Sequence, residues 1–249
     1  MRTNMVFTLP ILLVIFIYPG VVHAQGNNAN FFIKAVCSES KPLVYEEDGV
    51  IKGPGYDIAI RVLEHSNIPF SYEMQPWARV YQGGLTEKNF LVACLGRTSK
   101  REHLFHWIGP ISKDLDVAIY KMATNPAKIN NIEQAKHYNI GVLRGTYFQD
   151  FLEKSDFNKS RIYLTTEPEQ LLNMLIKKRY DLIIISDSVI PTIAKRLNIN
   201  PAAFERVAFA FSVAENLAFG KNASPELVKI LRASYDTLEA AGAFNELLK

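Results

Sequence analysis

The feature of this sequence that most limits its fold is an alternation of short apolar runs with amphipathic, helix-like segments. Residues 90–95 form a continuous apolar run, and residues 181–185 form another after an initial acid. Continuous apolar runs of this length are typical of parallel strands that are covered on both faces. The alternation therefore predicts right-handed βαβ units and an α/β fold with mostly parallel sheets.

The expected elements follow one another along most of the chain. Strands are expected at residues 31–37, 68–74, 90–95, 116–121, 139–143, 161–164, 181–185 and 215–219. Helices are expected at residues 56–65, 77–85, 132–137, 147–153, 168–178, 189–197 and 224–238. Thr166 with Glu169 predicts a capping box at the start of the helix at 168–178. Residues 186–188 predict the N-terminal cap of the helix at 189–197.

These elements fall into two groups, separated by the strand-like residues 116–121 and the polar residues 124–131. Two open α/β lobes with a central ligand cleft follow, because ligands bind beyond the carboxyl ends of the strands in open sheets. We expect residues 25–112 in a first lobe, 113–213 in a second lobe, and 214–249 in a return segment of the first. The chain would cross between the lobes near residues 112–113 and 213–214.

The N-terminus predicts export. Arg2 precedes an apolar run at residues 5–18, and small residues surround a cleavage point after Ala24. This layout predicts a cleaved signal peptide over residues 1–24. The alternative is an uncleaved membrane anchor, which the shortness of the run and the helix breakers at positions 19 and 20 disfavour.

Charge and cysteine content narrow the range of partners. The formal charge is +3 and basic residues are scattered, which argues against nucleic acid as a partner. The two cysteines, Cys37 and Cys94, do not match the four closely spaced ligands of a zinc site. Export permits a disulfide between them, and two separate buried thiols are the alternative. We expect no metal and no cofactor.

Two places in the sequence suit a small ligand, and the first of them suits an anion. Arg101 follows the apolar run at 90–95 in the segment 98–101, and its guanidinium fork matches a carboxylate. The alternative is a solvated basic turn. Trp77 stands directly after Pro76, where its ring can form a cleft wall that stacks on a ligand or can anchor the core.

Several motifs, taken in order, resemble the type II periplasmic solute-binding proteins, in particular bacterial extracellular solute-binding family 3. They are Gly55-Tyr56-Asp57-Ile58, Thr98-x-x-Arg101 with Phe105 and Gly109-Pro110, Gly141-Val-Leu-x-Gly145-Thr146, and Arg179-Tyr180-Asp181. Pro76-Trp77-Ala78-Arg79 and Trp107-Ile108-Gly109-Pro110 resemble a subgroup of short members. The resemblance implies two lobes around a cleft and a periplasmic location.

The resemblance also implies a ligand site. Arg101 would clamp a ligand carboxylate, and Trp77 would lie under the ligand side chain. The expected site further includes Glu39, Arg79, Gly96, Thr98, Gly145, Thr146, Tyr147, Ser186 and Asp187. The family's ammonium-binding acid falls near Ser186, one residue before Asp187, so the sequence leaves open which of the two contacts the ligand. An amine-free carboxylate is therefore an alternative to an amino acid.

The implied function is capture of a small carboxylate or amino-acid-like solute and its delivery to an ABC-type membrane permease. We expect a monomer without catalytic residues. One alternative is a binding protein that supplies a sensor. Another is an enzyme resembling cyclohexadienyl dehydratase, with Glu39 or Asp187 as its acid.

Overall fold

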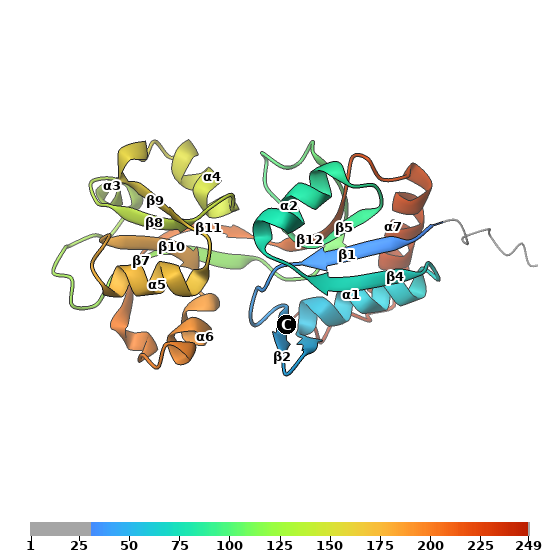
Figure 1. Ribbon diagram of the computed structural model, residues 1–249, viewed down its shortest axis with the longest axis horizontal. Helices are drawn as coiled ribbons and strands as arrows, with labels where there is room; N and C mark the ends of the chain where they lie inside the picture. Colours follow the sequence, from blue (N-terminus) through green and yellow to red (C-terminus); the bar gives the residue numbers. More distant parts are fainter. Residues whose placement is uncertain (1–30, 249) are drawn as a thin grey trace, which may run out of the picture.

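Two five-stranded sheets lie side by side along the long axis of the molecule, each with helices packed on it (Figure 1). The computed structural model describes residues 31–248. The predicted signal peptide at residues 1–24 lies outside the described residues. Among the helices of the described part, none has the length and apolar character needed to cross a membrane.

The first sheet contains the N-terminal strands and the last strand of the chain. In spatial order it consists of β4 (Phe70–Met74), β1 (Ile33–Cys37), β5 (Phe90–Gly96), β12 (Glu215–Gly220) and β6 (Phe105–Pro110). Strand β12 is antiparallel to β5 and β6, and the other four strands run in one direction. A separate hairpin joins β2 (Tyr45–Glu47) to β3 (Val50–Lys52).

Alternate residues of β5 enter two cores, which explains its continuous apolar run. Leu91 and Ala93 pack with α1 (Pro54–His65) and α7 (Pro225–Ala240) on one face. Phe90 and Val92 pack with α2 (Trp77–Thr86) on the other.

The second sheet repeats this arrangement with the middle of the chain. In spatial order it consists of β11 (Phe204–Val213), β7 (Leu115–Met122), β10 (Leu182–Ser186), β8 (Ile140–Leu143) and β9 (Ile162–Thr165). Only β7 runs against the other four. One core contains α3 (Ile132–Ala135) and α4 (Tyr147–Lys154), and the opposite core contains α5 (Pro168–Ile176) and α6 (Val189–Arg196). Two short 3₁₀ turns are η2 (Lys159–Arg161) and η3 (Pro201–Ala203). The predicted α/β class with mostly parallel sheets is confirmed.

The chain passes between the sheets twice, from β6 to β7 and from β11 to β12. The two crossing segments are hydrogen-bonded to each other. The Ile111 N–H donates to the Glu215 carbonyl at 2.8 Å, and the Glu215 N–H donates to Ser112 Oγ at 2.9 Å. The exact lobe boundaries at 112/113 and 213/214 stay a prediction.

Some local predictions were wrong. The predicted strands omit β6 and β11. Exposed residues and two register shifts interrupt any apolar run in β11, and the short β6 contains His106, Gly109 and Pro110. Helix α5 has Glu167 as its N-cap, with no side-chain cap bond, because Thr166 stands one residue too early for a capping box. The N-cap of α6 is Ser188, within the predicted residues 186–188, but its side chain makes no cap bond and its Oγ lies 3.1 Å from Ser186 Oγ instead.

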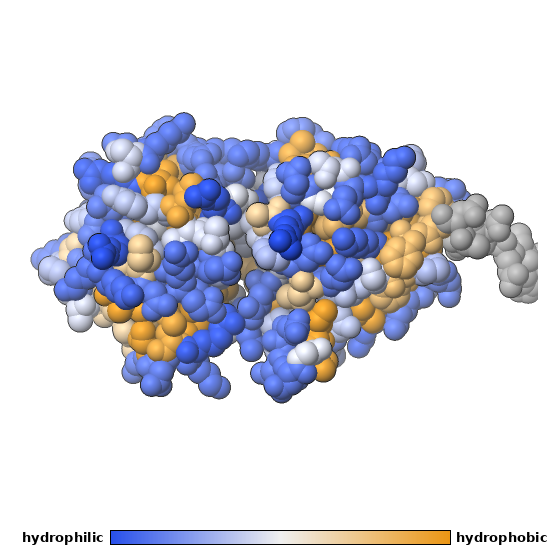
Figure 2. Space-filling model, in the orientation of Figure 1, coloured by the Kyte–Doolittle hydropathy of each residue, from blue (hydrophilic) through white to orange (hydrophobic). Residues whose placement is uncertain are grey.

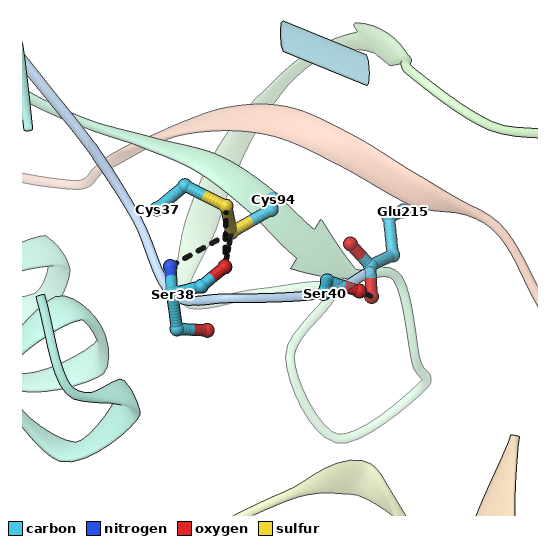
Figure 3. The surroundings of a disulfide bond; sticks show 5 residues. All are labelled: Cys37, Ser38, Ser40, Cys94 and Glu215. Carbon is cyan, nitrogen blue, oxygen red and sulfur yellow. Dashed lines mark hydrogen bonds between the residues drawn. A yellow bond between two sulfur atoms is a disulfide. The ribbon is translucent and has the colours of Figure 1, made fainter. Parts of the chain in front are cut away.

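Cys37 and Cys94 form a disulfide, which decides between the two alternatives for these residues. The bond links the carboxyl ends of adjacent strands β1 and β5, where the Cα atoms are 5.4 Å apart (Figure 3). The Ser38 N–H donates to Cys94 Sγ at 3.3 Å. The disulfide therefore fixes the segment at residues 38–40 that leads away from β1.

Candidate functional site

A cavity of about 820 Å³ lies between the two sheets and is lined by residues of both halves. Figure 2 shows the cleft between the halves from one side. Five predicted site residues line the cavity: Glu39, Trp77, Thr146, Tyr147 and Ser186. Cys94, Ser40, Arg196 and Glu215 also line it. The predicted residues Arg79, Gly96, Thr98, Arg101, Gly145 and Asp187 do not.

Arg101 lies behind the cavity wall and is 1 % exposed. Its Nη1 donates to the Gly96 carbonyl and its Nη2 to the Gly145 carbonyl, both at 3.3 Å. The guanidinium carbon lies 5.0 Å from the ring centre of Tyr81, and the rings of Trp77 and Tyr147 are also within cation–π range. Burial lowers the pKa of Arg101. Arg101 therefore joins the two halves through Gly145.

The Gly145 carbonyl is a shared acceptor on the second half. It also accepts a bond of 2.9 Å from Trp77 Nε1, so the indole of α2 spans the cleft. Gly145 has a φ of +70°, a conformation that glycine adopts readily. Trp77 therefore forms part of the cavity wall, and its indole N–H donates to the Gly145 carbonyl rather than into the cavity.

Gly96 and Tyr147 form a second close approach between the halves. A Cβ atom at position 96 would lie 2.5 Å from Cδ1 and Cε1 of the Tyr147 ring. Only glycine leaves room for the ring there. The Tyr147 ring therefore covers the backbone position that was predicted to contact the ligand.

Asp187, one of the two predicted acids, is paired with residues of the protein rather than directed into the cavity. Asp187 accepts from the Tyr120 hydroxyl at 2.9 Å and lies 3.1 Å from Arg206 Nε. Ser186, one residue earlier, lines the cavity. Ser188, one residue later, also lines the cavity, and Asp187 does not, so the Asp187 side chain points away from the cavity.

Glu39 pairs with Arg196 across the cleft. Arg196 Nη1 lies 3.1 Å from Glu39 Oε1, and its Nη2 contacts Glu169. Arg196 belongs to α6 of the second half, and Glu39 follows β1 of the first. This ion pair therefore connects the halves at another edge of the cavity.

Glu215 is a cavity residue that the sequence analysis missed. It begins β12, is 6 % exposed, and accepts a 3.3 Å hydrogen bond from Ser40 Oγ at Oε1 (Figure 3). Its Oε2 has no hydrogen-bond partner among the described residues. Burial raises the pKa of Glu215 to about 7, although Ser40, Arg101 and Tyr147 oppose the increase.

A signal for Glu215 was present in the sequence. It is a single acid between the predicted crossing at 213–214 and the apolar run that follows. A charged residue at the start of a buried strand needs a partner. In the described part of the chain, no group of three or more His, Cys, Asp or Glu side chains is arranged to hold a metal ion.

Comparison with known proteins identifies similar folds. No family model matches the chain, and no curated protein matches it in sequence. A histidine kinase sensor domain with similarity to periplasmic binding proteins has a TM-score of 0.74 at 13% identity, covering 86% of this chain and 93% of its own.

Two further structures, ArgBP and AbpA, have similar TM-scores to this chain. The P235GK mutant of ArgBP from T. maritima has a TM-score of 0.73 at 15% identity, with 88% of this chain and 94% of its own covered. The amino acid ABC transporter substrate-binding protein AbpA from Streptococcus pneumoniae, bound to L-arginine, has a TM-score of 0.69 at 15% identity, with 89% and 94% covered. This chain therefore has the periplasmic-binding-protein fold that these structures share.

Proposed function

We propose that this chain is an exported solute-binding protein that captures a small amino-acid-like or carboxylate ligand between its two halves. The observation that carries the proposal is the cavity of about 820 Å³, which residues of both sheets line. A ligand in this cavity touches both halves and stabilises their approach through contacts that an open form lacks. The shared fold with amino-acid-binding proteins supports this function.

Contacts across the cleft indicate how closure is completed. Trp77 and Arg101 share the Gly145 carbonyl, Lys100 pairs with Asp150, and Glu39 pairs with Arg196. The Arg101 bonds at 3.3 Å are longer than usual for this donor. Arg101 does not line the cavity in this form. In the proposed complex its side chain therefore turns toward the cavity, and a ligand carboxylate replaces the Gly145 carbonyl as the acceptor from Arg101.

The proposed location is the periplasm, and the proposed partner is an ABC-type permease. A sensor is the alternative partner, supported by the similarity to a histidine kinase sensor domain. In either case the partner would recognise the closed form of the protein. The protein would act as a monomer.

A thermal-shift screen of the chain from residue 25 onward tests the proposal. The compounds are amino acids, dicarboxylates, polyamines and cyclohexadienyl acids. A ligand at about 100 times its Kd adds about 2.7 kcal/mol to the free energy of unfolding, which raises Tm by several degrees. A shift with one compound class would support a solute receptor, and the absence of any shift would contradict it.

Glu215 also supports a second candidate function, a dehydratase. A buried carboxyl with a pKa raised to about 7 can protonate a leaving hydroxyl group near neutral pH. The acids predicted for this role fit less well, because Glu39 pairs with Arg196 and Asp187 with Arg206. Incubation with cyclohexadienyl acids distinguishes the candidates, since an enzyme forms product and a binding protein returns the compound unchanged.

A further inference from the structure

We propose that Glu215 binds a protonated amine of the ligand, so that the cavity selects solutes that carry an ammonium group. This inference rests on the proposed function and specifies its ligand class. It assigns the ammonium site to the crossing segment between the halves, where no acid was predicted to act.

The position of Glu215 is fixed before any ligand arrives. Its backbone N–H and carbonyl are held by Ser112 and Ile111 of the other crossing segment. Glu215 lines the cavity, and its Oε1 accepts a hydrogen bond from Ser40 Oγ. Oε2 is left buried without a hydrogen-bond partner. A small rotation of the carboxyl toward the cavity would let an N–H donor of a ligand satisfy this oxygen.

In the described part of the chain, the Glu215 carboxylate has no cation paired with it. No lysine, arginine or histidine of the described residues lies within ion-pair distance of the Glu215 carboxylate. Arg101 acts on the carboxylate from farther away, and its own Nε has no hydrogen-bond partner. A buried carboxylate without a paired cation is costly, and an ammonium group offsets that cost most directly.

The other acids are less suited to bind an amine. Asp187 is engaged by Tyr120 and Arg206, and Glu39 by Arg196. Ser186, at the position where the family's ammonium-binding acid was expected, offers only a hydroxyl group. Glu215 is therefore the buried cavity acid that lacks a cationic partner, and among the described residues only the Ser40 and Tyr147 hydroxyl groups interact with its carboxyl at close range.

A pH dependence follows from the groups that face Glu215. They are Arg101 from the loop after β5, Tyr147 from α4, Tyr72 from β4, and the Ser40 hydroxyl. Burial raises the pKa of Tyr72 and of Tyr147, so both phenols stay neutral near pH 7. Arg101 stays charged despite the lowering of its pKa. Within this group only the Glu215 carboxyl changes its charge between pH 5.5 and pH 8.

Matched compounds and variants test the inference by calorimetric titration. The amine probes are L-glutamine, L-norleucine, L-glutamate and putrescine. Their amine-free counterparts are glutaramate, hexanoate, glutarate and 1,4-butanediol. The variants are Glu215→Gln, which keeps the side-chain shape, and Glu64→Gln, which makes the same charge change at an exposed site of α1 outside the cavity.

We expect an amine probe to bind and its counterpart to bind far more weakly. Glu215→Gln should weaken the amine at pH 8 by about 30-fold or more, the loss typical of removing one member of a buried charge pair, and Glu64→Gln should not. For the unmodified chain the Kd should be about 30-fold weaker at pH 5.5 than at pH 8, because only about 3% of Glu215 is then ionised. Glu215→Gln should lack this dependence.

Other outcomes separate the two proposals. Counterparts that bind as tightly as the amines would overturn the role of Glu215 and leave the solute-binding function standing. An amine that binds Glu215→Gln with unchanged Kd would do the same. If no probe of either kind bound, the proposed function would fail as well. If Glu215→Gln did not fold, a Kd independent of pH in the unmodified chain would still contradict the inference.

Discussion

At the scale of single residues, Glu215 links the burial of a carboxyl group to the stability of the chain. Its carboxyl is buried at the crossing between the halves, where desolvation outweighs the favourable effects of Ser40 and Arg101. Such a group lowers the stability of the ligand-free chain and gains a partner when the ligand binds. The residue thus links stability, pH and binding.

The free chain should therefore lose stability as the pH rises. The pKa of Glu215 is about 7 in the fold and near 4.5 in the unfolded chain, so the native state holds the proton between these values. The free energy of unfolding due to this group is largest below pH 4.5 and falls by about 3 kcal/mol as the pH rises through 7.

Urea unfolding at pH 5 and pH 8, without ligand, measures this change. Glu215→Gln should remove most of the difference between the two pH values and should be more stable than the unmodified chain at pH 8. Equal pH dependence in both proteins would show that Glu215 is not the group responsible.

Arg101 has a different role at the same scale. Arg101→Ala removes the donor that we propose for a ligand carboxylate, and it also removes a contact between the halves at Gly145. Binding of a carboxylate ligand should weaken by roughly 2–4 kcal/mol, the range for removing one partner of a buried charge pair. Titration calorimetry measures the loss, and unchanged affinity would place the carboxylate elsewhere.

At the scale of helices and strands, the buried parallel strands were the easiest to predict. Strands β5 and β10 are apolar on both faces because each contributes to two cores, and this produces a continuous run in the sequence. Strand β11 was missed because it is an edge strand with two register shifts and several exposed residues. Its pairing with β7 depends on tertiary contacts that no local pattern shows.

The disulfide stabilises the first half by closing a long loop between β1 and β5. Cys37 and Cys94 are 57 residues apart, and a loop of this length contributes about 4 kcal/mol in the chain-entropy account. Replacing both residues with alanine should lower the free energy of unfolding by about this amount. Denaturant unfolding measures it, and adding reductant to the unmodified chain should reproduce the loss. A reductant that changes nothing would contradict this role.

At the scale of the whole molecule, the site depends on how the two halves meet. The strand ends and the resemblance to solute-binding proteins predicted five residues that line the cavity: Glu39, Trp77, Thr146, Tyr147 and Ser186. The direction of Asp187 and the inward position of Glu215 were not predicted. The first depends on which of two adjacent residues faces inward, and the second on the path of the return crossing.

Gly96 should control closure because Tyr147 packs directly on it. Gly96→Ala places a methyl group within 2.5 Å of the ring and should weaken ligand binding by about 1–3 kcal/mol. The halves should remain folded, since the clash arises only when they approach.

A double-mutant cycle with Tyr147→Ala is the control for this prediction. If the clash with the ring is the cause, Gly96→Ala should cost little affinity in the Tyr147→Ala background. An equal cost in both backgrounds, measured by titration calorimetry, would show that the effect lies within β5 rather than between the halves.

A crystal structure of the chain with the amine that gives the largest thermal shift tests the central claim most directly. We predict that the ligand lies between the two sheets, in contact with residues of both, with its ammonium nitrogen within about 3 Å of Glu215 Oε2. A ligand bound outside this cavity, or in the cavity with its amine directed away from Glu215, would contradict the account.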